Sequence, residues 1–472
     1  MGALIHCRDA GLLTEYRGAS FGDVRLERRL LRLAASLSVA PAASFPVAAN
    51  DDAELEATYR FLNNERVTAE QIMRPHQART VERCRASEVV VVAHDTTEFN
   101  FGKSGRKDLG NVGRGKSFGF YGHFALAVAR VVEQRQPLGV LGFEIHSRDG
   151  TKGRRGHRTL QTDPRNESKR WLKMVERAAV ALDGCAALHV MDREADSYGL
   201  MGNLVAGDHR FVIRMAGDKR RIADDGDEKT VGAKLEGAGT LAEREVPVSA
   251  RGRSLLPSYR KRHPERAARI AKLDVTSTQI TLSRPDSSNK SPHKTLLLNV
   301  VHVIEREPPA GEVAVEWRLW TTEPITTADE VLAVVDAYRC RWMIEEYFKA
   351  LKSGCAIESR QLETHDGLVN SLALYVPVAW RLLRLRTLSR ERNLPATDVL
   401  TSVQLRCLAG ALKQTRRPQL ASNPTAREAM LGVAGLGGHI KNNGDPGWIV
   451  LGRGLDKLLA IEVGFRLATE QM

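Results

Sequence analysis

The chain has 472 residues, and its 70 Lys and Arg residues against 57 Asp and Glu residues give a formal net charge of +13. This length allows about three domains, and 42% hydrophobic with 27% charged residues is the balance of a globular chain. No apolar run reaches the roughly 18 residues that a membrane span needs, and the first residues do not form a signal peptide. The six cysteines lack zinc-binding spacing. We therefore expect a cytoplasmic protein without a membrane contact, whose positive charge suits a polyanionic partner.

The N-terminal region is predicted to be helical. Residues 17–37 place leucine and valine side chains at helical spacing and arginines on the other faces, with Arg25 and Arg28 among them. Residues 51–63 are predicted to form a second helix, which contains Arg60. Taken alone, such an arginine-rich face is commonly a solvated surface.

Two short apolar runs each end in an acidic residue, one in Asp95 and the other in Asp192. They cover residues 89–95 and 186–192. Nearly continuous apolar runs of this length are typical of central strands that are buried on both faces. The other elements expected in this region are strands over 122–131 and 139–146 and a helix over 168–181. This order of elements predicts an α/β fold.

The stretch from residue 226 to residue 326 has a different pattern. Apolar and polar residues alternate in short segments between polar turns, which is typical of half-buried strands. These segments are 244–249, 279–283, 294–304 and 314–321, and the last contains Trp317. A dense basic stretch lies between residues 251 and 269. We expect a β-rich insertion here, then a long helix whose capping box is Thr327 and Glu330, then a helical C-terminal region.

A phosphate-loop pattern, GxxxxGKS, is present at residues 110–117. Such a loop binds phosphate because a strand delivers it to a helix N-terminus with free N–H groups. Here the preceding residues do not resemble a strand, and the following residues run into a strand and not a helix. We expect a flexible basic loop and no nucleotide cofactor, and an NTPase is the less favoured alternative.

Four polar residues of the predicted long helix are separated by 3, 4 and 7 residues: Tyr338, Arg341, Glu345 and Lys352. At about 100° per residue they fall within roughly 60° of one another and form one stripe. The flanks of the stripe are apolar, so we do not expect Glu345 on a freely solvated surface. A charged stripe alone is more often a solvated face or an ion pair.

Three acids are candidate metal ligands, because Asp95 and Asp192 end apolar strands and Glu345 lies in the stripe. Open sheets place ligand-binding groups at strand ends. Carboxylates without a matching set of Cys or His suit cations such as Mg²⁺ or Mn²⁺. Two such ions can assist an in-line phosphoryl displacement, so the predicted reaction is phosphodiester hydrolysis or transesterification. Other acids are expected to form ion pairs or to be solvated: Glu98, Glu194, Asp196 and Glu346.

The motif Tyr338-x2-Arg341-x3-Glu345-x6-Lys352 occurs together with Asp192-Arg-Glu-Ala-Asp and Asp95-Thr-Thr. In this order, with the β-rich insertion before the Glu, these motifs resemble the insertion-sequence-four family of bacterial DDE cut-and-paste transposases. The similarity extends over nearly the whole chain. It implies an RNase H-like catalytic core with a β-rich insertion, a helical N-terminal DNA-binding domain and a helical C-terminal region. The corresponding segments are 76–225 and 327–390 for the core, 226–326 for the insertion, 1–75 for the DNA-end-binding domain and 391–472 for the region expected to dimerise.

The resemblance also implies a reaction. Asp95, Asp192 and Glu345 would hold two Mg²⁺ ions, for which Mn²⁺ can substitute, in a homodimer bound to double-stranded DNA. Water would first nick the DNA at a terminal inverted repeat, and the freed 3′-OH would attack the opposite strand and finally join target DNA. The alternative to an active transposase is a catalytically silent relative that binds the DNA ends without cutting them.

The resemblance implies DNA contacts for six residues: Tyr338, Arg341 and Lys352 at phosphates near the cut, Trp317 at a flipped base, and Arg214 and Arg60 elsewhere on the DNA. Arg25 and Arg28 on the basic helix are also expected to contact DNA. For Trp317 the alternative is a core tryptophan between strands. For Arg214 and Arg60 the alternative is a surface ion pair.

Overall fold

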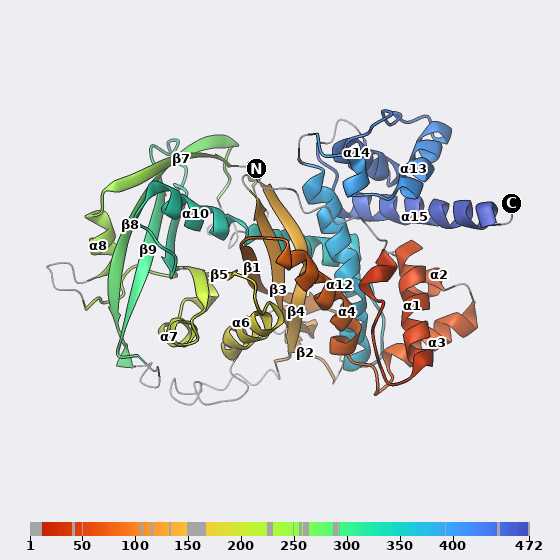
Figure 1. Ribbon diagram of the computed structural model, residues 1–472, viewed down its shortest axis with the longest axis horizontal. Helices are drawn as coiled ribbons and strands as arrows, with labels where there is room; N and C mark the ends of the chain where they lie inside the picture. The colour runs from red at the N-terminus through yellow and green to blue at the C-terminus, as the bar shows by residue number, and fades with distance from the viewer. Residues whose placement is uncertain are drawn as a thin grey trace. The chain divides into compact units, whose positions relative to one another are not determined.

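The computed structural model describes residues 12–470 except 40–42, 50, 104–105, 107, 114–116, 132–133, 149–166, 224–229, 249, 254–256, 258–263, 287–290, 292, 392 and 441–443. Its contacts divide the chain into two units, and each is described by itself. The first unit consists of Met1–Arg154, Glu176–Ala186 and Trp342–Met472, and the second of Arg155–Val175 and Ala187–Arg341. The protein is a mixed α/β protein, as predicted (Figure 1). The finer division at residues 75, 225, 326 and 390 stays a prediction.

The N-terminal part of the first unit is helical, which confirms the prediction. It contains η1 (Leu12–Glu15), α1 (Val24–Val39), α2 (Phe45–Ala48), α3 (Asp52–Leu62) and α4 (Ala69–Arg85). Helix α1 does not begin at residue 17, because Gly18 and Gly22 have positive φ angles of 93° and 72° that an α-helix excludes. The Asp51 side chain caps α3 by accepting a hydrogen bond from the Glu54 N–H at 2.7 Å.

The sheet of the first unit has β3 (Ser117–Val131) at its centre. On one side β3 pairs antiparallel with β1 (Val90–Asn100), and it also pairs antiparallel with β2 (Gly110–Val112) and β4 (Gln134–His146). Residues 114–116 of the phosphate-loop pattern lie outside the described residues. The first three residues of the pattern form β2, so the expected flexible loop is wrong there, and Ser117 already belongs to β3. This is not the strand–loop–helix order that phosphate binding of that kind needs.

Helix α12 (His365–Leu388) is the central helix of the first unit and lies beside α4 and β4 (Figure 1). By length and composition it is apolar enough to cross a membrane, but 94% of its most apolar window is buried inside the protein, which is the position of a core helix. Its Trp380 indole donates a hydrogen bond to the Pro137 carbonyl at 3.0 Å. The C-terminal helices that follow are η7 (Ala396–Asp398), α13 (Ser402–Gln414), α14 (Ala426–Leu436) and α15 (Trp448–Glu470).

The second unit has a sheet of six strands. Their order is β5 (Ala187–Met191), β6 (Arg210–Arg214), β10 (Glu316–Thr321), β9 (Thr295–Glu305), β8 (Arg269–Ser283) and β7 (Thr240–Val248). Strands β5 and β6 are parallel, and the pairing of β10 with β6 joins the strands of the predicted insertion to them in one sheet. Helices η3 (Arg193–Ala195), α7 (Tyr198–Ala206), α8 (Val231–Glu236) and α10 (Ala328–Arg339) complete this unit, and α6 (Lys169–Ala181) spans the boundary at Val175. Its core includes Trp320, Phe211 and Ile213.

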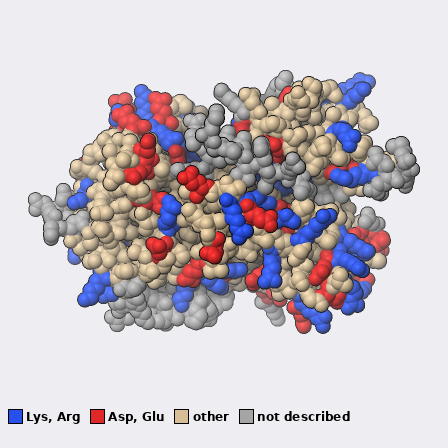
Figure 2. Space-filling view, in the orientation of Figure 1, with Lys and Arg blue, Asp and Glu red and all other residues tan. Residues whose placement is uncertain are grey.

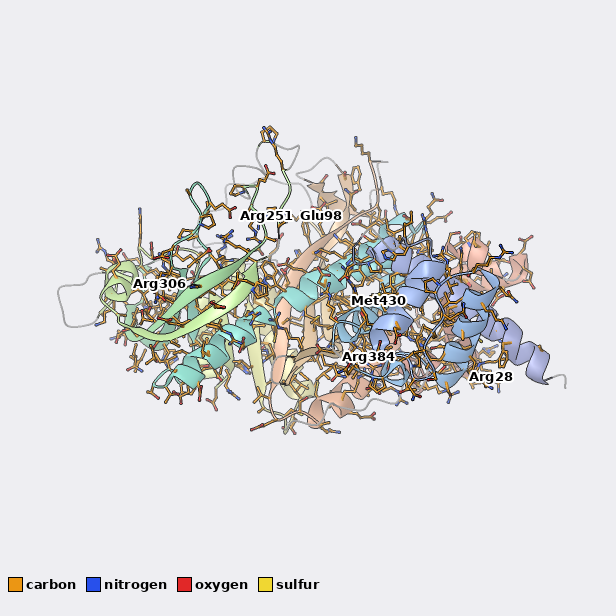
Figure 3. The ribbon with its side chains drawn as sticks, turned by 90° about the horizontal axis from the view of Figure 1, so that it is seen from above. Arg28, Glu98, Arg251, Arg306, Arg384 and Met430 are labelled. Carbon is orange, nitrogen blue, oxygen red and sulfur yellow. The ribbon has the colours of Figure 1, made fainter. Side chains whose placement is uncertain are left out.

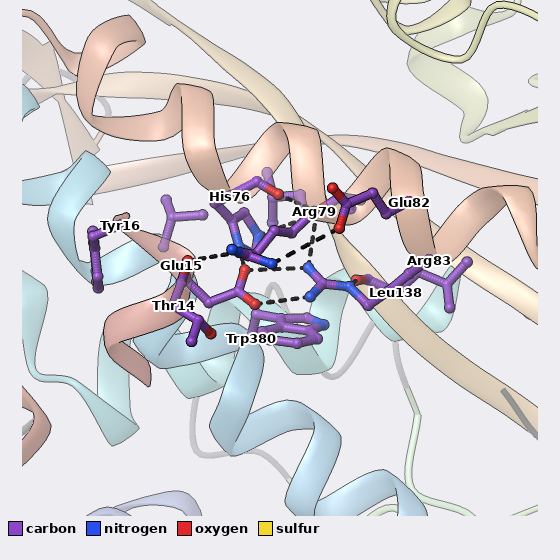
Figure 4. A network of polar contacts seen from close by, with 12 residues as sticks. Thr14, Glu15, Tyr16, His76, Arg79, Glu82, Arg83, Leu138 and Trp380 are labelled. Carbon is purple, nitrogen blue, oxygen red and sulfur yellow. Dashed lines mark hydrogen bonds and ion pairs between the residues drawn. The ribbon is translucent and has the colours of Figure 1, made fainter. Parts of the chain in front are cut away.

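A buried polar network, which we call the Glu15 network, holds the N-terminal segment of the first unit (Figure 4). The Glu15 carboxylate accepts hydrogen bonds from the Arg83 guanidinium at 2.8 Å and 3.2 Å and contacts His76 Nδ1 at 2.5 Å. His76 Nε2 accepts a hydrogen bond from the Val140 N–H at 3.0 Å, so His76 donates through Nδ1 and is neutral. The ring of Trp380 lies 4.2 Å from the Arg83 guanidinium. The network joins η1, α4, β4 and α12.

The pKa values of the network fit this arrangement. Burial alone would raise the pKa of Glu15, but the hydrogen bonds from His76 and Arg83 and the positive charge of Arg83 outweigh burial and bring the pKa to about 2. Burial lowers the pKa of His76, and its contact with Glu15 opposes this only in part. At neutral pH the network therefore holds a carboxylate, a guanidinium and a neutral imidazole.

Removing the Glu15 carboxylate should strongly destabilise the first unit. We expect Glu15→Ala to lower the free energy of unfolding by about 3–5 kcal/mol, because it leaves the buried charge of Arg83 without a partner. The matched control is Glu82→Ala, since Glu82 pairs with Arg79 at 3.8 Å on an exposed face of α4 and should cost less than about 1 kcal/mol. Urea unfolding measures both variants, and equal losses would contradict the role of the network.

Stability should also fall with falling pH because of the network. The folded state holds His76 neutral, so the unfolded state binds the extra proton below the ordinary His pKa of 6.5. Glu15 adds stability that is fully present above pH 4.5 and is lost as the pH falls toward about 2. Urea unfolding gives the free energy of unfolding at several pH values between 7.5 and 5. The slope of this free energy against pH should be shallower for His76→Gln than for wild type, by at most about 1.4 kcal/mol per pH unit. Identical slopes would show that His76 is not held neutral.

Candidate active site

Asp95 lies in the middle of a strand, so the prediction that it ends one is wrong. Strand β1 continues to Asn100, paired with β3 as far as Gly119. Gly119 permits this close pairing, because a Cβ atom there would lie 1.8 Å from the Phe99 carbonyl oxygen. Asp95 is half-buried and is paired in register with Phe124 of β3.

The face of β1 that carries Asp95 is covered by helix α11 (Trp342–Lys349). Residues opposite one another in a strand pair lie on the same face of the sheet, so Phe124 shares the face of Asp95. The Phe124 ring lies 5.5 Å from the ring of Phe348 on α11. Glu345 precedes Phe348 by three residues and therefore lies on the same side of that helix. The structure thus places Asp95 and Glu345 on elements that pack against each other.

Glu345 is half-buried in the first turn of α11. The N-terminal end of a helix carries a partial positive charge, which stabilises a carboxylate at this position. The neighbouring side chains Ile344 and Phe348 are buried. This agrees with the expectation that Glu345 is not on a freely solvated surface.

The prediction of a single long helix is wrong, although the predicted capping box at Thr327 is confirmed. Helix α10 ends at Arg339, and α11 begins at Trp342. The Cys340 thiol contacts the Asp336 carbonyl at 3.4 Å, and the Cys340 N–H bonds the carbonyls of Ala337 and Tyr338 instead of that of Asp336. This tighter turn ends α10.

The helix that carries Glu345 also becomes irregular after this residue. Helix α11 passes into a π-helix, η5 (Ala350–Gly354), in which the Cys355 N–H bonds the Ala350 carbonyl at 2.9 Å. A π-helical turn is wider than an α-helical turn and is frequent at functional sites. Tyr338 and Arg341 thus belong to the second unit, whereas Glu345 and Lys352 belong to the first.

Lys352 contacts the strand that carries Asp95. Its ammonium group donates a hydrogen bond to the Glu98 carbonyl, lies 5.4 Å from the Phe99 ring and pairs with Glu358 at 3.6 Å. Glu358 also accepts a hydrogen bond from the Asn100 N–H at 3.0 Å. The sequence analysis missed Glu358, because no spacing relates it to β1.

Asp192 directly follows β5, as predicted, and belongs to the second unit. Its Oδ1 accepts a hydrogen bond from the Glu194 N–H at 2.8 Å and caps the short helix η3. The three predicted ligands are therefore not gathered within either unit. Among the residues that the structure describes, no group of three His, Cys, Asp or Glu side chains is close enough to hold a metal ion.

The second unit brings together four of the residues predicted to contact DNA, which we call the Tyr338 cluster: Tyr338, Trp317, Arg214 and Arg341. The Trp317 ring meets the Tyr338 ring edge to face at 5.7 Å, and the Arg341 guanidinium lies 6.0 Å from the same ring. Burial raises the pKa of Tyr338, while the charges of Arg341 and Arg214 and their hydrogen bonds to the phenol lower it. Arg214 also donates to the Glu316 carbonyl at 3.3 Å.

Trp317 is not a core tryptophan, since its side chain is only half-buried. The core tryptophan of strand β10 is Trp320, which is fully buried and donates a hydrogen bond to Asp196 at 3.1 Å. Alternation along the strand places these two tryptophans on opposite faces of β10, because they are three residues apart, but it does not say which face is buried.

Three predicted DNA-contacting arginines lie on the surface of the N-terminal helices. Arg25 pairs with Asp23 at 2.8 Å, and Arg60 pairs with Glu56 one helical turn away. Arg28 is exposed on α1 (Figure 3). Positive and negative side chains are interspersed on the visible surface of this region (Figure 2). Arg60 therefore has the surface ion pair that was its alternative role.

The four further acids all have partners, as expected for acids that are not metal ligands. Glu98 accepts a hydrogen bond from the Gly113 N–H at 3.0 Å. Glu194 pairs with Arg170 at 2.7 Å, Asp196 with Arg220 at 2.7 Å and Glu346 with Lys349 at 2.6 Å.

Two family models match the chain. The model described as Transposase DNA-binding matches residues 12–67, and the one described as Transposase DDE domain matches residues 91–376. The second covers more than half of the chain and includes all three candidate acids. The protein therefore belongs to the family of proteins with a transposase DDE domain. Members of this family generally use divalent metal ions.

Among solved structures, the chain is similar to the piggyBac transposase, determined as a synaptic complex with hairpin DNA. The two share 11% sequence identity with a TM-score of 0.29, over 72% of this chain and 55% of that one. This chain thus spans about half the length of that protein.

The two tryptophans of β10 should differ in their effect on stability. We expect Trp320→Ala to lower the free energy of unfolding by about 3–5 kcal/mol, because it leaves a large cavity and removes one of the hydrogen bonds to the buried Asp196 carboxylate. Trp317→Ala should cost only about 1 kcal/mol, since it removes one aromatic contact at a half-buried site. Urea unfolding measures both, and a loss for Trp317→Ala as large as that for Trp320→Ala would restore the core role for Trp317.

Proposed function

We propose that the protein is a cut-and-paste transposase of the insertion-sequence-four type, with Asp95, Asp192 and Glu345 as its catalytic carboxylates. The observation that carries the proposal is the DDE-domain match over residues 91–376, which includes the three acids in the predicted order. The placement of Asp95 on β1 and Glu345 on the helix that covers this face supports it. We also propose that the sheet and its helices form an RNase H-like core.

The donor set fits a divalent oxygen-seeking cation. Both Asp95 and Glu345 are half-buried carboxylates, and the second lies at the positive end of a helix. With Asp192 they would hold two Mg²⁺ ions, or Mn²⁺ in their place. Such ions supply charge that favours attack on a phosphodiester and departure of the leaving oxygen. Lys352 would fix β1 relative to the π-helix through its contact with the Glu98 carbonyl.

The Tyr338 cluster would bind the DNA beside the cut. The guanidinium groups of Arg214 and Arg341 suit phosphate oxygens, because they present several N–H donors in a fixed fork. The half-buried Trp317 ring offers a face on which a flipped base can stack. Tyr338 orients both arginines and Trp317 through contacts to one aromatic ring.

The N-terminal helices would bind the terminal inverted repeats through Arg25, Arg28 and Arg60. The surface ion pairs of Arg25 and Arg60 would exchange their carboxylate partners for phosphates on binding. We propose a homodimer on the DNA, a hydrolytic first nick, strand transfer of the freed 3′-OH to target DNA, and a cytoplasmic location at the nucleoid.

The test is cleavage of a plasmid that carries the DNA flanking the gene, with Mg²⁺ present. Asp95→Ala, Asp192→Ala and Glu345→Ala should each lower the cleavage rate by at least about 100-fold, because the ions contribute several kcal/mol to the transition state. The matched control is Glu346→Ala, since Glu346 neighbours Glu345 but pairs with Lys349, and it should cleave at the wild-type rate.

Two results would contradict the proposal. Unchanged cleavage by the three variants would show that the acids are wrongly assigned. Equal DNA binding by wild type and the triple variant, with no nicking by either, would identify a silent DNA-binding relative.

A further inference from the structure

Asp196 is a completely buried carboxylate four residues after Asp192. Its side chain has 0% exposure, and an ionised group at such a position needs partners for both oxygens. Oδ1 pairs with the Arg220 guanidinium at 2.7 Å and accepts the Trp320 indole N–H at 3.1 Å. Oδ2 accepts the Ala216 N–H at 2.6 Å. With both oxygens occupied and no exposed surface, Asp196 is not available as a metal ligand.

The partners of Asp196 come from the elements that carry the Tyr338 cluster. Ala216 follows β6, the strand of Arg214, and Trp320 lies on β10, the strand of Trp317. The same two strands are joined just beyond β6, where the Met215 N–H bonds the Arg318 carbonyl at 2.8 Å. One carboxylate therefore fixes the end of η3 to both strands.

The turn between Asp192 and Asp196 leaves little freedom to the Asp192 side chain. Asp192 caps η3, which is only three residues long, and Asp196 follows η3 directly. Arg220 also donates a hydrogen bond to the Asp196 carbonyl at 2.7 Å, so both the side chain and the backbone of this residue are held. A shift of Asp196 would move η3 and with it the Asp192 carboxylate.

We propose that Asp196 is a positioning residue, which sets the Asp192 carboxylate in a fixed relation to the Tyr338 cluster. This rests on the proposed function, in which Asp192 binds metal and the cluster binds DNA. The outer hydrogen-bond partners that orient a metal ligand typically change metal affinity by 10–100-fold when they are removed. Asp196 has this role for Asp192 through the backbone of a short turn.

The test compares Asp196→Asn with two other variants of the same turn in the full-length protein. Asp196→Asn keeps the size of the side chain but weakens its pairing with Arg220. Mn²⁺ binding is measured by electron paramagnetic resonance of free Mn²⁺, end-DNA binding by gel shift, and cleavage as a function of Mg²⁺ concentration. The control is Glu194→Gln, since Glu194 lies in the turn but its side chain is exposed and pairs with Arg170.

We expect Asp196→Asn to weaken Mn²⁺ binding by about 10-fold or more and to shift the Mg²⁺ dependence of cleavage upward by a similar factor. DNA binding should stay at the wild-type level, and Glu194→Gln should behave as wild type throughout. If Asp196→Asn does not fold, Arg220→Gln removes the same ion pair from its half-exposed side and carries the same expectation.

The outcomes separate this proposal from the proposed function. Asp192→Ala should abolish Mn²⁺ binding, and if it does not, the assignment of Asp192 as a metal ligand is wrong. If Asp192→Ala abolishes binding while folded Asp196→Asn binds Mn²⁺ and responds to Mg²⁺ as wild type does, only the positioning role is overturned. Equal weakening by Glu194→Gln and Asp196→Asn would also overturn it.

Discussion

The pairing of Glu15 with Arg83 is the interaction on which the first unit depends most. Glu15 lies in the segment that matches the DNA-binding family model, and Arg83 lies on α4, which packs on β4. Strand β4 pairs with β3, and β3 pairs with the strand of Asp95. A buried ion pair adds little net stability, but it is costly to break and so specifies one arrangement. The segment that matches this family model is thus held on the sheet by charge and not only by apolar contacts.

Burial divides the acids of this protein into two groups. Glu15 and Asp196 are buried, and each has an arginine as partner. Asp95, Asp192 and Glu345 are half-buried at a strand face, a strand end and a helix start. A buried carboxylate whose oxygens are both occupied fixes structure, whereas a half-buried one remains accessible to a cation. Sequence motifs do not separate the two groups, since Asp192 and Asp196 belong to the same five-residue run.

The sequence predicted features that depend on neighbouring residues and missed those that depend on distant ones. The apolar run before Asp192, the capping box at Thr327 and the four strands of the insertion are local patterns, and all are present. The continuation of β1 beyond Asp95 depends on its pairing with β3, and the Glu15 network depends on a partner 68 residues away. At the break the Cys340 N–H bonds the Ala337 carbonyl in a tighter turn, and no Gly or Pro near this position marks it in the sequence.

The π-helix after α11 changes the angular relation between the side chains of Glu345 and Lys352. In a regular α-helix the seven steps between them make about two turns, and both side chains would lie on one side. The wider π-helical turn alters this phase, and the Lys352 ammonium group reaches the backbone of β1. The spacing between Glu345 and Lys352 therefore includes a π-helical segment of the backbone, in addition to the two side chains that define the motif.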